Sequence, residues 1–171
     1  TRTDGMFDLA VNGGGYLTID YQREGYLPMQ RTISVPWQAY TVLPDVVMVS
    51  VDSAVTTIDL EHSVMQVARG NEVSDPDGSR QATLLFLPGT AAELVMPDGS
   101  VQALETMNVR ATEYSVGENG PQAMPGELPP TSGYTYAVDF SVDEAMAAGA
   151  DSIRFNQPVM SYVENFLDFP V

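Results

Sequence analysis

Residues 3–35 read TDGMFDLAVNGGGYLTIDYQREGYLPMQRTISV, and this stretch decides the fold prediction. Two runs, residues 6–11 and 16–21, flank a glycine-rich turn at residues 12–15. In each run every second residue is apolar or aromatic, so one face of an extended chain collects them. Alternation on both sides of a glycine turn predicts a β-hairpin with one buried face.

Similar runs recur along the rest of the chain between turn signals such as Pro-Asp-Gly. Strand runs at this spacing are typical of β-sandwiches. One short helix is expected near 141–149, because Ser141 and Glu144 fit a capping box and Gly149 suits a helix end. Further strands are predicted at residues 30–35, 41–43, 46–51, 63–68, 81–87, 91–96, 101–104, 106–116, 134–140, 152–155 and 159–163, with a loop at 71–79.

The pattern divides near residue 60, where the polar stretch 52–60 ends and the strand runs begin again. The fold prediction is therefore all-β, with two β-sandwich units at residues 1–60 and 61–171. A sandwich normally has strands before such a hairpin, so we expect the first unit to be truncated at its N-terminus.

The composition limits the chemistry that the chain can perform. It has 171 residues with 23 acidic and seven basic side chains, and its net charge is −16. A chain this acidic is repelled by phosphate backbones and anionic lipid, so nucleic acid and membrane surfaces are poor partners. No apolar run approaches the roughly 20 residues of a transmembrane helix, so membrane insertion is not expected. Cysteine and lysine are absent, which excludes disulfides, thiolate metal sites and Schiff-base chemistry.

No residue stands out as catalytic. His62 is the only histidine, and Ser63 and Glu61 are its nearest candidates for a triad. Neighbouring residues of a strand point to opposite faces, so a surface histidine is favoured instead. Gly13, Gly14 and Gly15 lie between two strands rather than before a helix, which favours a turn over a nucleotide loop. A carboxylate pair for glycoside hydrolysis stays open, because sequence does not select two of the acids.

Two binding chemistries have some support. Asp75, Asp77 and Ser79 place hard oxygens at alternate positions of a glycine-containing loop, which makes calcium the one cofactor with candidate ligands. The same loop also fits an ordinary turn, so no metal or cofactor site is assigned. A sugar-stacking surface has five candidate aromatic residues, for which packing is the favoured role: Tyr16, Tyr21, Tyr26, Trp37 and Tyr40.

The N-terminal stretch resembles the carboxypeptidase regulatory-like, transthyretin-like module of large cell-surface proteins. The resemblance rests on residues 3–7, Leu9, Val11, the glycine turn, residues 17–19 and the pair Gly25-Tyr26. The continuation, LPMQRTISVPW followed by VVM, is similar to the corresponding module of teneurins and bacterial Rhs/YD-repeat proteins. The likeness covers about residues 1–60 and implies a sandwich of seven strands.

The second half resembles the region that precedes the repeats of bacterial Rhs/YD proteins, through RQATLLFLPGT (80–90), TMNVRATEY (106–114) and the C-terminal 162–171. The run LFLPGT also resembles ZU5-type sandwiches. These resemblances imply a non-catalytic structural or adhesion module, extracellular or on the cell surface within a larger protein. Its partners would be other domains of the parent chain, another protein or a glycan. The alternative function is a calcium- or carbohydrate-binding module.

Overall fold

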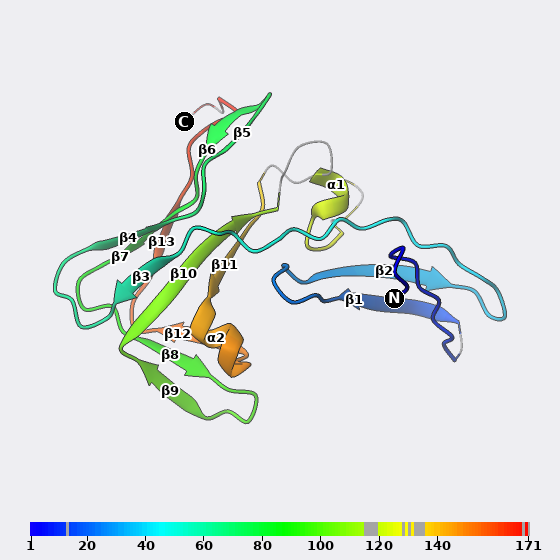
Figure 1. Ribbon diagram of the computed structural model, residues 1–171, viewed down its shortest axis with the longest axis horizontal. Helices are drawn as coiled ribbons and strands as arrows, with labels where there is room; N and C mark the ends of the chain where they lie inside the picture. Colours follow the sequence, from blue (N-terminus) through cyan, green and yellow to red (C-terminus); the bar gives the residue numbers. More distant parts are fainter. Residues whose placement is uncertain are drawn as a thin grey trace.

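The computed structural model describes residues 1–12, 14–114, 120–127, 129, 131, 136–168 and 170. Within these residues the chain forms thirteen β-strands and two short helices (Figure 1). The all-β prediction is confirmed. The strands are β1 (Gly15–Tyr21), β2 (Met29–Val35), β3 (Thr56–Asp59), β4 (Gln66–Arg69), β5 (Val73–Asp75), β6 (Gly78–Arg80), β7 (Thr83–Phe86), β8 (Ala92–Val95), β9 (Val101–Leu104), β10 (Thr106–Glu113), β11 (Val138–Val142), β12 (Ser152–Phe155) and β13 (Met160–Tyr162), and the helices are α1 (Gly120–Ala123) and α2 (Asp143–Ala148).

The N-terminal hairpin pairs β1 with the strand that follows it, whereas the sequence predicted pairing with the preceding residues 6–11. β1 pairs in antiparallel fashion with β2, so that Tyr21 lies opposite Met29. The connecting turn is closed by the Tyr26 amide donating to the Arg23 carbonyl, and Gly25 supplies the positive φ of 77° that the turn requires. The hairpin prediction is therefore right for β1 and wrong for its partner.

Residues 6–11 form no strand, although their alternation predicted one. Met6, Leu9 and Val11 are exposed, and the segment contacts the hairpin through the ring of Phe7 against Tyr21. Alternation alone does not make a strand when no neighbouring strand accepts its backbone hydrogen bonds. The predicted glycine turn includes Gly13, which lies outside the described residues.

Residues 41–51 also run as extended chain rather than as the two predicted strands. Pro44 interrupts the segment, and only an isolated bridge between Tyr26 and Ser50 is formed. Single backbone bonds hold its end, from Leu27 to the Val49 carbonyl and from Val51 to the Gly25 carbonyl. We call residues 1–51 the N-terminal unit and residues 52–168 the main β unit.

The main β unit is built around two three-stranded sheets that face one another. Their strand orders are β11-β10-β3 and β13-β7-β4. Ile58 and Met107 from the first sheet pack with Phe86 from the second, and all three are almost fully buried. A third sheet, β12-β8-β9, closes one end, and the β5–β6 hairpin projects from the other (Figure 1).

Two strand regions were missed at the sequence level. β3 falls in the polar stretch before residue 60, yet it pairs with β10 through four residues. The predicted loop 71–79 contains the β5–β6 hairpin, in which Ser74 pairs with Ser79 across the turn at Pro76-Asp77. The division of the chain at residue 60 stays a prediction.

The predicted helix is present as α2, but it begins differently. Val142 precedes it in extended conformation and gives no side-chain cap, so the expected capping box of Ser141 and Glu144 is wrong. Ser141 belongs to β11 instead, and Glu144 accepts hydrogen bonds from the Asn108 amide and side chain. Gly149 ends the helix at φ 65° as expected. The strand predicted at 134–140 begins at Val138; residues 134 and 135 lie outside the described part of the chain.

Candidate functional site at the junction of the two β units

The N-terminal unit is attached to the main β unit through a small second core. Leu27, Tyr114 and Met124 are buried together, and Val49 and Val51 pack against them. The three buried residues come from the turn after β1, the end of β10 and the segment after α1. Apolar burial therefore joins three regions that are far apart in the sequence, and it favours a fixed arrangement of the two units.

A buried arginine crosses this junction. Arg31 lies on β2 and is 7% exposed. Its Nη1 donates to the carbonyl of Met124 at 3.0 Å and its Nη2 to the carbonyl of Gln122 at 2.9 Å. A further bond reaches the neighbouring Gln30 carbonyl at 2.6 Å. Because a buried guanidinium is costly unless its donors are satisfied, these carbonyls fix where β2 lies against α1.

Backbone bonds complete the contact between the units. The Gln30 amide donates to the Pro125 carbonyl at 2.8 Å, and the Val47 amide donates to the Gln122 carbonyl at 3.2 Å. The Tyr114 hydroxyl reaches the Pro28 carbonyl at 3.3 Å. Polar groups from both sides of the junction are thus paired with each other, which gives the junction a specific geometry in addition to apolar burial.

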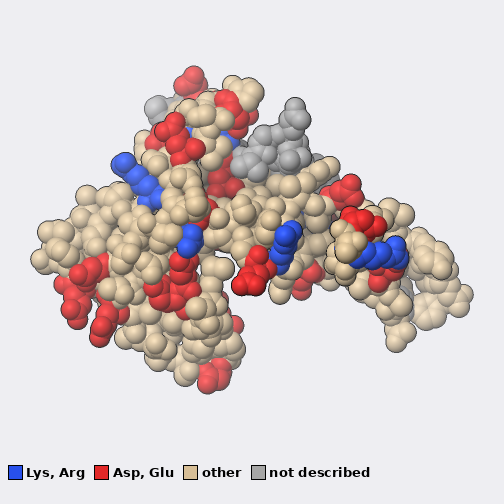
Figure 2. Space-filling view, in the orientation of Figure 1, with Lys and Arg blue, Asp and Glu red and all other residues tan. Residues whose placement is uncertain are grey.

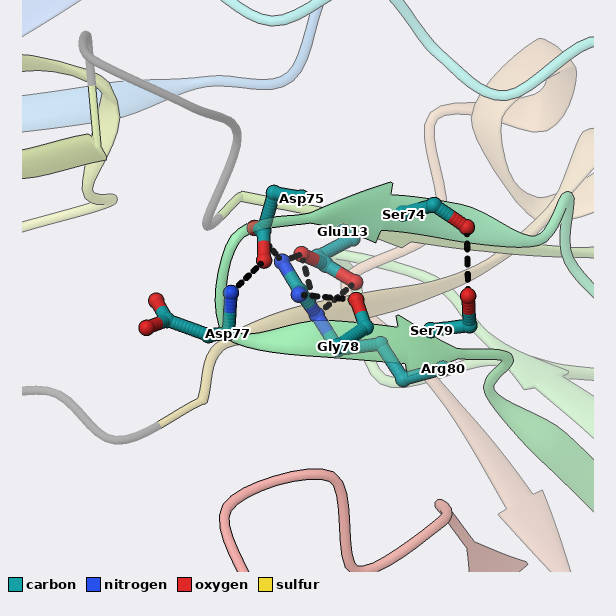
Figure 3. A network of polar contacts seen from close by, with 7 residues as sticks. All are labelled: Ser74, Asp75, Asp77, Gly78, Ser79, Arg80 and Glu113. Carbon is teal, nitrogen blue, oxygen red and sulfur yellow. Dashed lines mark hydrogen bonds and ion pairs between the residues drawn. The ribbon is translucent and has the colours of Figure 1, made fainter.

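The candidate calcium loop forms an ion-pair cluster instead. Figure 3 shows the Arg80 side chain between Asp75 on β5 and Glu113 on β10. Arg80 Nη2 lies 2.8 Å from Asp75 Oδ2, and Arg80 Nε donates to both Glu113 oxygens at 3.0 and 3.1 Å. Asp77 donates its amide to Asp75 Oδ1, and the hydroxyls of Ser74 and Ser79 bond one another. The Asp75 carboxylate is therefore already paired with an arginine.

The cluster has the electrostatics of a structural ion pair. The hydrogen bond that Arg80 donates to Asp75 lowers the pKa of the Asp75 carboxyl, whereas burial raises the pKa of Glu113 above its ordinary value. The Arg80 guanidinium also stacks 4.5 Å from the Phe166 ring. Burial raises the pKa of Tyr136, which packs edge-on against Phe166, to about 12. The C-terminal segment is thereby held against β6.

Arg110 anchors α2 to the strands of the main β unit. Arg110 on β10 makes a two-pronged ion pair with Asp143, at 2.6 and 2.8 Å, and donates to the Asp52 carbonyl at 2.6 Å. The pair lowers the pKa of Asp143. Asp52 in turn accepts from the Asn71 amide at 2.7 Å. These bonds tie Asp52, the first residue of the main β unit, to β10 and to the segment at Asn71.

The catalytic and metal candidates do not assemble. Glu61, His62 and Ser63 are exposed in the turn between β3 and β4, and among the described residues no hydrogen bond joins their side chains. No group of three histidine or acidic residues within the described ranges is arranged to hold a metal ion. None of the helices in the described part of the chain is long and apolar enough to span a membrane.

The candidate sugar-stacking aromatics divide into two groups. Tyr21 contacts Phe7, and Tyr26 lies under the Arg23 guanidinium at 4.3 Å. The other three are exposed, and sugar binding by them stays a prediction: Tyr16, Trp37 and Tyr40.

Comparison with known proteins concerns the N-terminal unit above all. Residues 1–48 match the family model described as Teneurin TTR-like domain. Teneurin-3 of Danio rerio is 38% identical over 60 residues, which is 35% of this chain and 2% of that protein. Teneurin-m of Drosophila melanogaster is 46% identical over 48 residues, or 28% of this chain and 2% of that protein. Teneurin-4 of Mus musculus is 30% identical over 76 residues, 44% of this chain and 3% of that protein.

The expected transthyretin-like resemblance is thus confirmed in its teneurin form for residues 1–48. This chain spans only 2–3% of the length of these relatives. No solved structure matches it. The likeness of the second half to bacterial Rhs/YD proteins and to ZU5 sandwiches stays a prediction.

Proposed function

We propose that the chain is a non-catalytic structural joint of a large cell-surface protein, in which a teneurin-type transthyretin-like unit is held rigidly on a second β unit. The Arg31 contact carries the proposal. Its buried guanidinium donates to the Gln122 and Met124 carbonyls of the other unit. A residue used this way sets the position of one unit on the other, which is what a joint requires.

The ionic clusters support the same role. Arg80 and Arg110 are each paired with carboxylates from other strands or from α2, and both pairs lie at least partly out of solvent. In both clusters the charged side chains form ion pairs with other residues of the same chain. Buried charges satisfied in this way specify one arrangement of strands and are weak evidence for catalysis.

The finer part of the proposal concerns the parent protein. The teneurin relatives support an extracellular or cell-surface location. The resemblance of the sequence to Rhs/YD proteins adds a YD-repeat region elsewhere in the same polypeptide to this proposal. The partners of the joint are then neighbouring domains of the parent chain. The net charge of −16 disfavours nucleic acid as an additional partner.

Pulse proteolysis with thermolysin across a urea gradient tests the joint. Fragments from residues 1–51 and from residues 52–168 are identified by mass spectrometry at each urea concentration. A rigid joint unfolds cooperatively, so both units become cleavable at the same urea concentration. Cleavage throughout residues 1–51 in the absence of urea, with the main β unit intact, would show a floppy appendage and sink the proposal.

A further inference from the structure

The main β unit contains an apolar groove of about 440 Å³ on the side of α2. Its innermost lining residues are Leu84, Phe86 and Val109, which belong to the buried core. The walls come from β11 with α2 and from β12 with β13. Residues that line the walls and stay partly or largely exposed are Phe140, Ala145, Met146, Ile153, Phe155 and Val159. The sandwich is therefore open to solvent along this side.

The strands around the groove are sheet edges. Within the described part of the chain, β11 pairs only with β10, β12 only with β8, and β13 only with β7. Each leaves one row of backbone amides and carbonyls without a strand partner. β13 is three residues long and follows Pro158, which suits a protected edge. β11 is five residues long and carries Val138, Phe140 and Val142 at alternate positions, so it is the better template for an added strand.

The charge around the groove favours a basic segment of a partner protein over a second copy of this chain. Asp151 is the one charged residue among those that line the groove. The whole chain carries −16, and Figure 2 shows acidic side chains scattered over the main β unit with few basic ones between them. A second copy of this chain would bring like charge to the groove, whereas a segment bearing lysine or arginine would meet complementary charge.

We propose that this groove takes an extended segment of a partner protein, apolar at alternate positions and flanked by lysine or arginine, which adds to β11 as a strand. Its apolar side chains enter between Phe140 and Val159, and a basic side chain lies beside Asp151. Main-chain hydrogen bonds to β11 supply affinity, and the apolar groove sets which alternate residues fit. The partner surface goes beyond the proposed joint, because none of these residues takes part in the junction with the N-terminal unit.

The test uses a synthetic peptide, acetyl-KVTVTVTVK-amide with a fluorescent label, and the same peptide with glutamate at both ends. Binding to the 171-residue chain is followed by fluorescence anisotropy, and the protected strand is identified by amide hydrogen exchange. We expect the lysine peptide to bind at least about tenfold more tightly than the glutamate peptide and to slow exchange in β11.

Matched variants separate the groove from the rest of the surface. Phe140 lines the groove and is 44% exposed, whereas Tyr162 is 58% exposed and does not line it. Phe140→Ser is expected to weaken binding of the lysine peptide by about tenfold or more, and Tyr162→Ser is expected to weaken it by less than about twofold. Asp151→Asn changes an exposed side chain and is expected to reduce the preference for lysine over glutamate, which keeps the test valid if Phe140→Ser does not fold.

Three results would overturn the proposal. The first is no binding of either peptide at millimolar concentration. The second is equal weakening by Phe140→Ser and Tyr162→Ser, which would indicate general charge attraction. The third is sedimentation showing that two copies of the chain associate through this groove, because the occupant would then be a second copy.

Discussion

Replacing Arg31 with methionine tests whether the junction is held by the buried guanidinium. Methionine keeps most of the side-chain volume but removes the two bonds from Arg31 to the Gln122 and Met124 carbonyls. The Gln122 carbonyl keeps a donor, the Val47 amide, so the loss is partial. Hydrogen bonds from charged donors contribute about 1.5–3 kcal/mol each. Relief from burying a charge offsets part of this, and the net loss is about 2–3 kcal/mol.

The loss is measured as local opening of the N-terminal unit. Amide hydrogen exchange in β1 and β2 is expected to accelerate about 30- to 150-fold in Arg31→Met, which is the equivalent of 2–3 kcal/mol. Strands β7 and β8 of the main β unit are expected to change little, because none of their residues takes part in the junction. The separation of these two responses is what identifies a joint.

Arg23→Met is the matched control. Arg23 belongs to the same unit and lies over the Tyr26 ring at 4.3 Å, but it is exposed and makes no side-chain hydrogen bond across the junction to the residues that the structure describes. An exposed contact of this kind is worth about 0.5–1 kcal/mol, so exchange should change by less than about fivefold. Unchanged exchange in Arg31→Met, or an equal effect of Arg23→Met, would refute the reasoning.

Three further predictions concern the main β unit. Asp143→Asn removes a carboxylate whose pKa is lowered from the ordinary aspartate value by the hydrogen bond from Arg110. Because the folded-state pKa is lowered, the stabilisation is complete above the ordinary value and is lost as the pH falls through the folded-state value. The urea midpoints of wild type and variant should therefore differ at pH 7, and the difference should shrink on acidification. A variant difference that grows on acidification would contradict this. Gly70→Ala places a Cβ 2.2 Å from the Ala111 carbonyl oxygen and should lower the urea unfolding free energy by about 2–3 kcal/mol, whereas a neutral result would show that the backbones are free to separate. Millimolar calcium should leave the thermal midpoint unchanged within about 1 °C, because the Asp75 carboxylate is occupied by arginine; a rise of several degrees would restore the calcium hypothesis.

Alternation in the sequence correctly indicated most strands of the main β unit, and it is clearest in strands such as β8 and β10 that bury one face. β10 shows this well, with Met107, Val109 and Ala111 buried on one side. The same rule failed at residues 6–11, where alternation is present but no strand of the described residues pairs with the segment. Pairing depends on long-range contacts that a local pattern does not contain.

The sequence carries a signal for the junction in the register of its charged residues. Arg31 occupies an inward position of β2, where Met29 and Ile33 set the buried or half-buried face. Glu113 likewise continues the buried row of β10. A charged residue at an apolar register position needs a partner, so these two residues mark buried polar contacts. Their partners come from residues 80, 122 and 124, and only the folded chain reveals them.

The central claim is that the two units form one rigid joint, and a distance distribution tests it most directly. The chain has no cysteine, so spin labels can be placed uniquely by Ser34→Cys in β2 and Gln102→Cys in β9, both exposed positions. Double electron–electron resonance is predicted to give one narrow distance peak for this pair, which broadens when Arg31→Met is added. A broad or multi-peaked distribution in the chain with native Arg31 would contradict the claim.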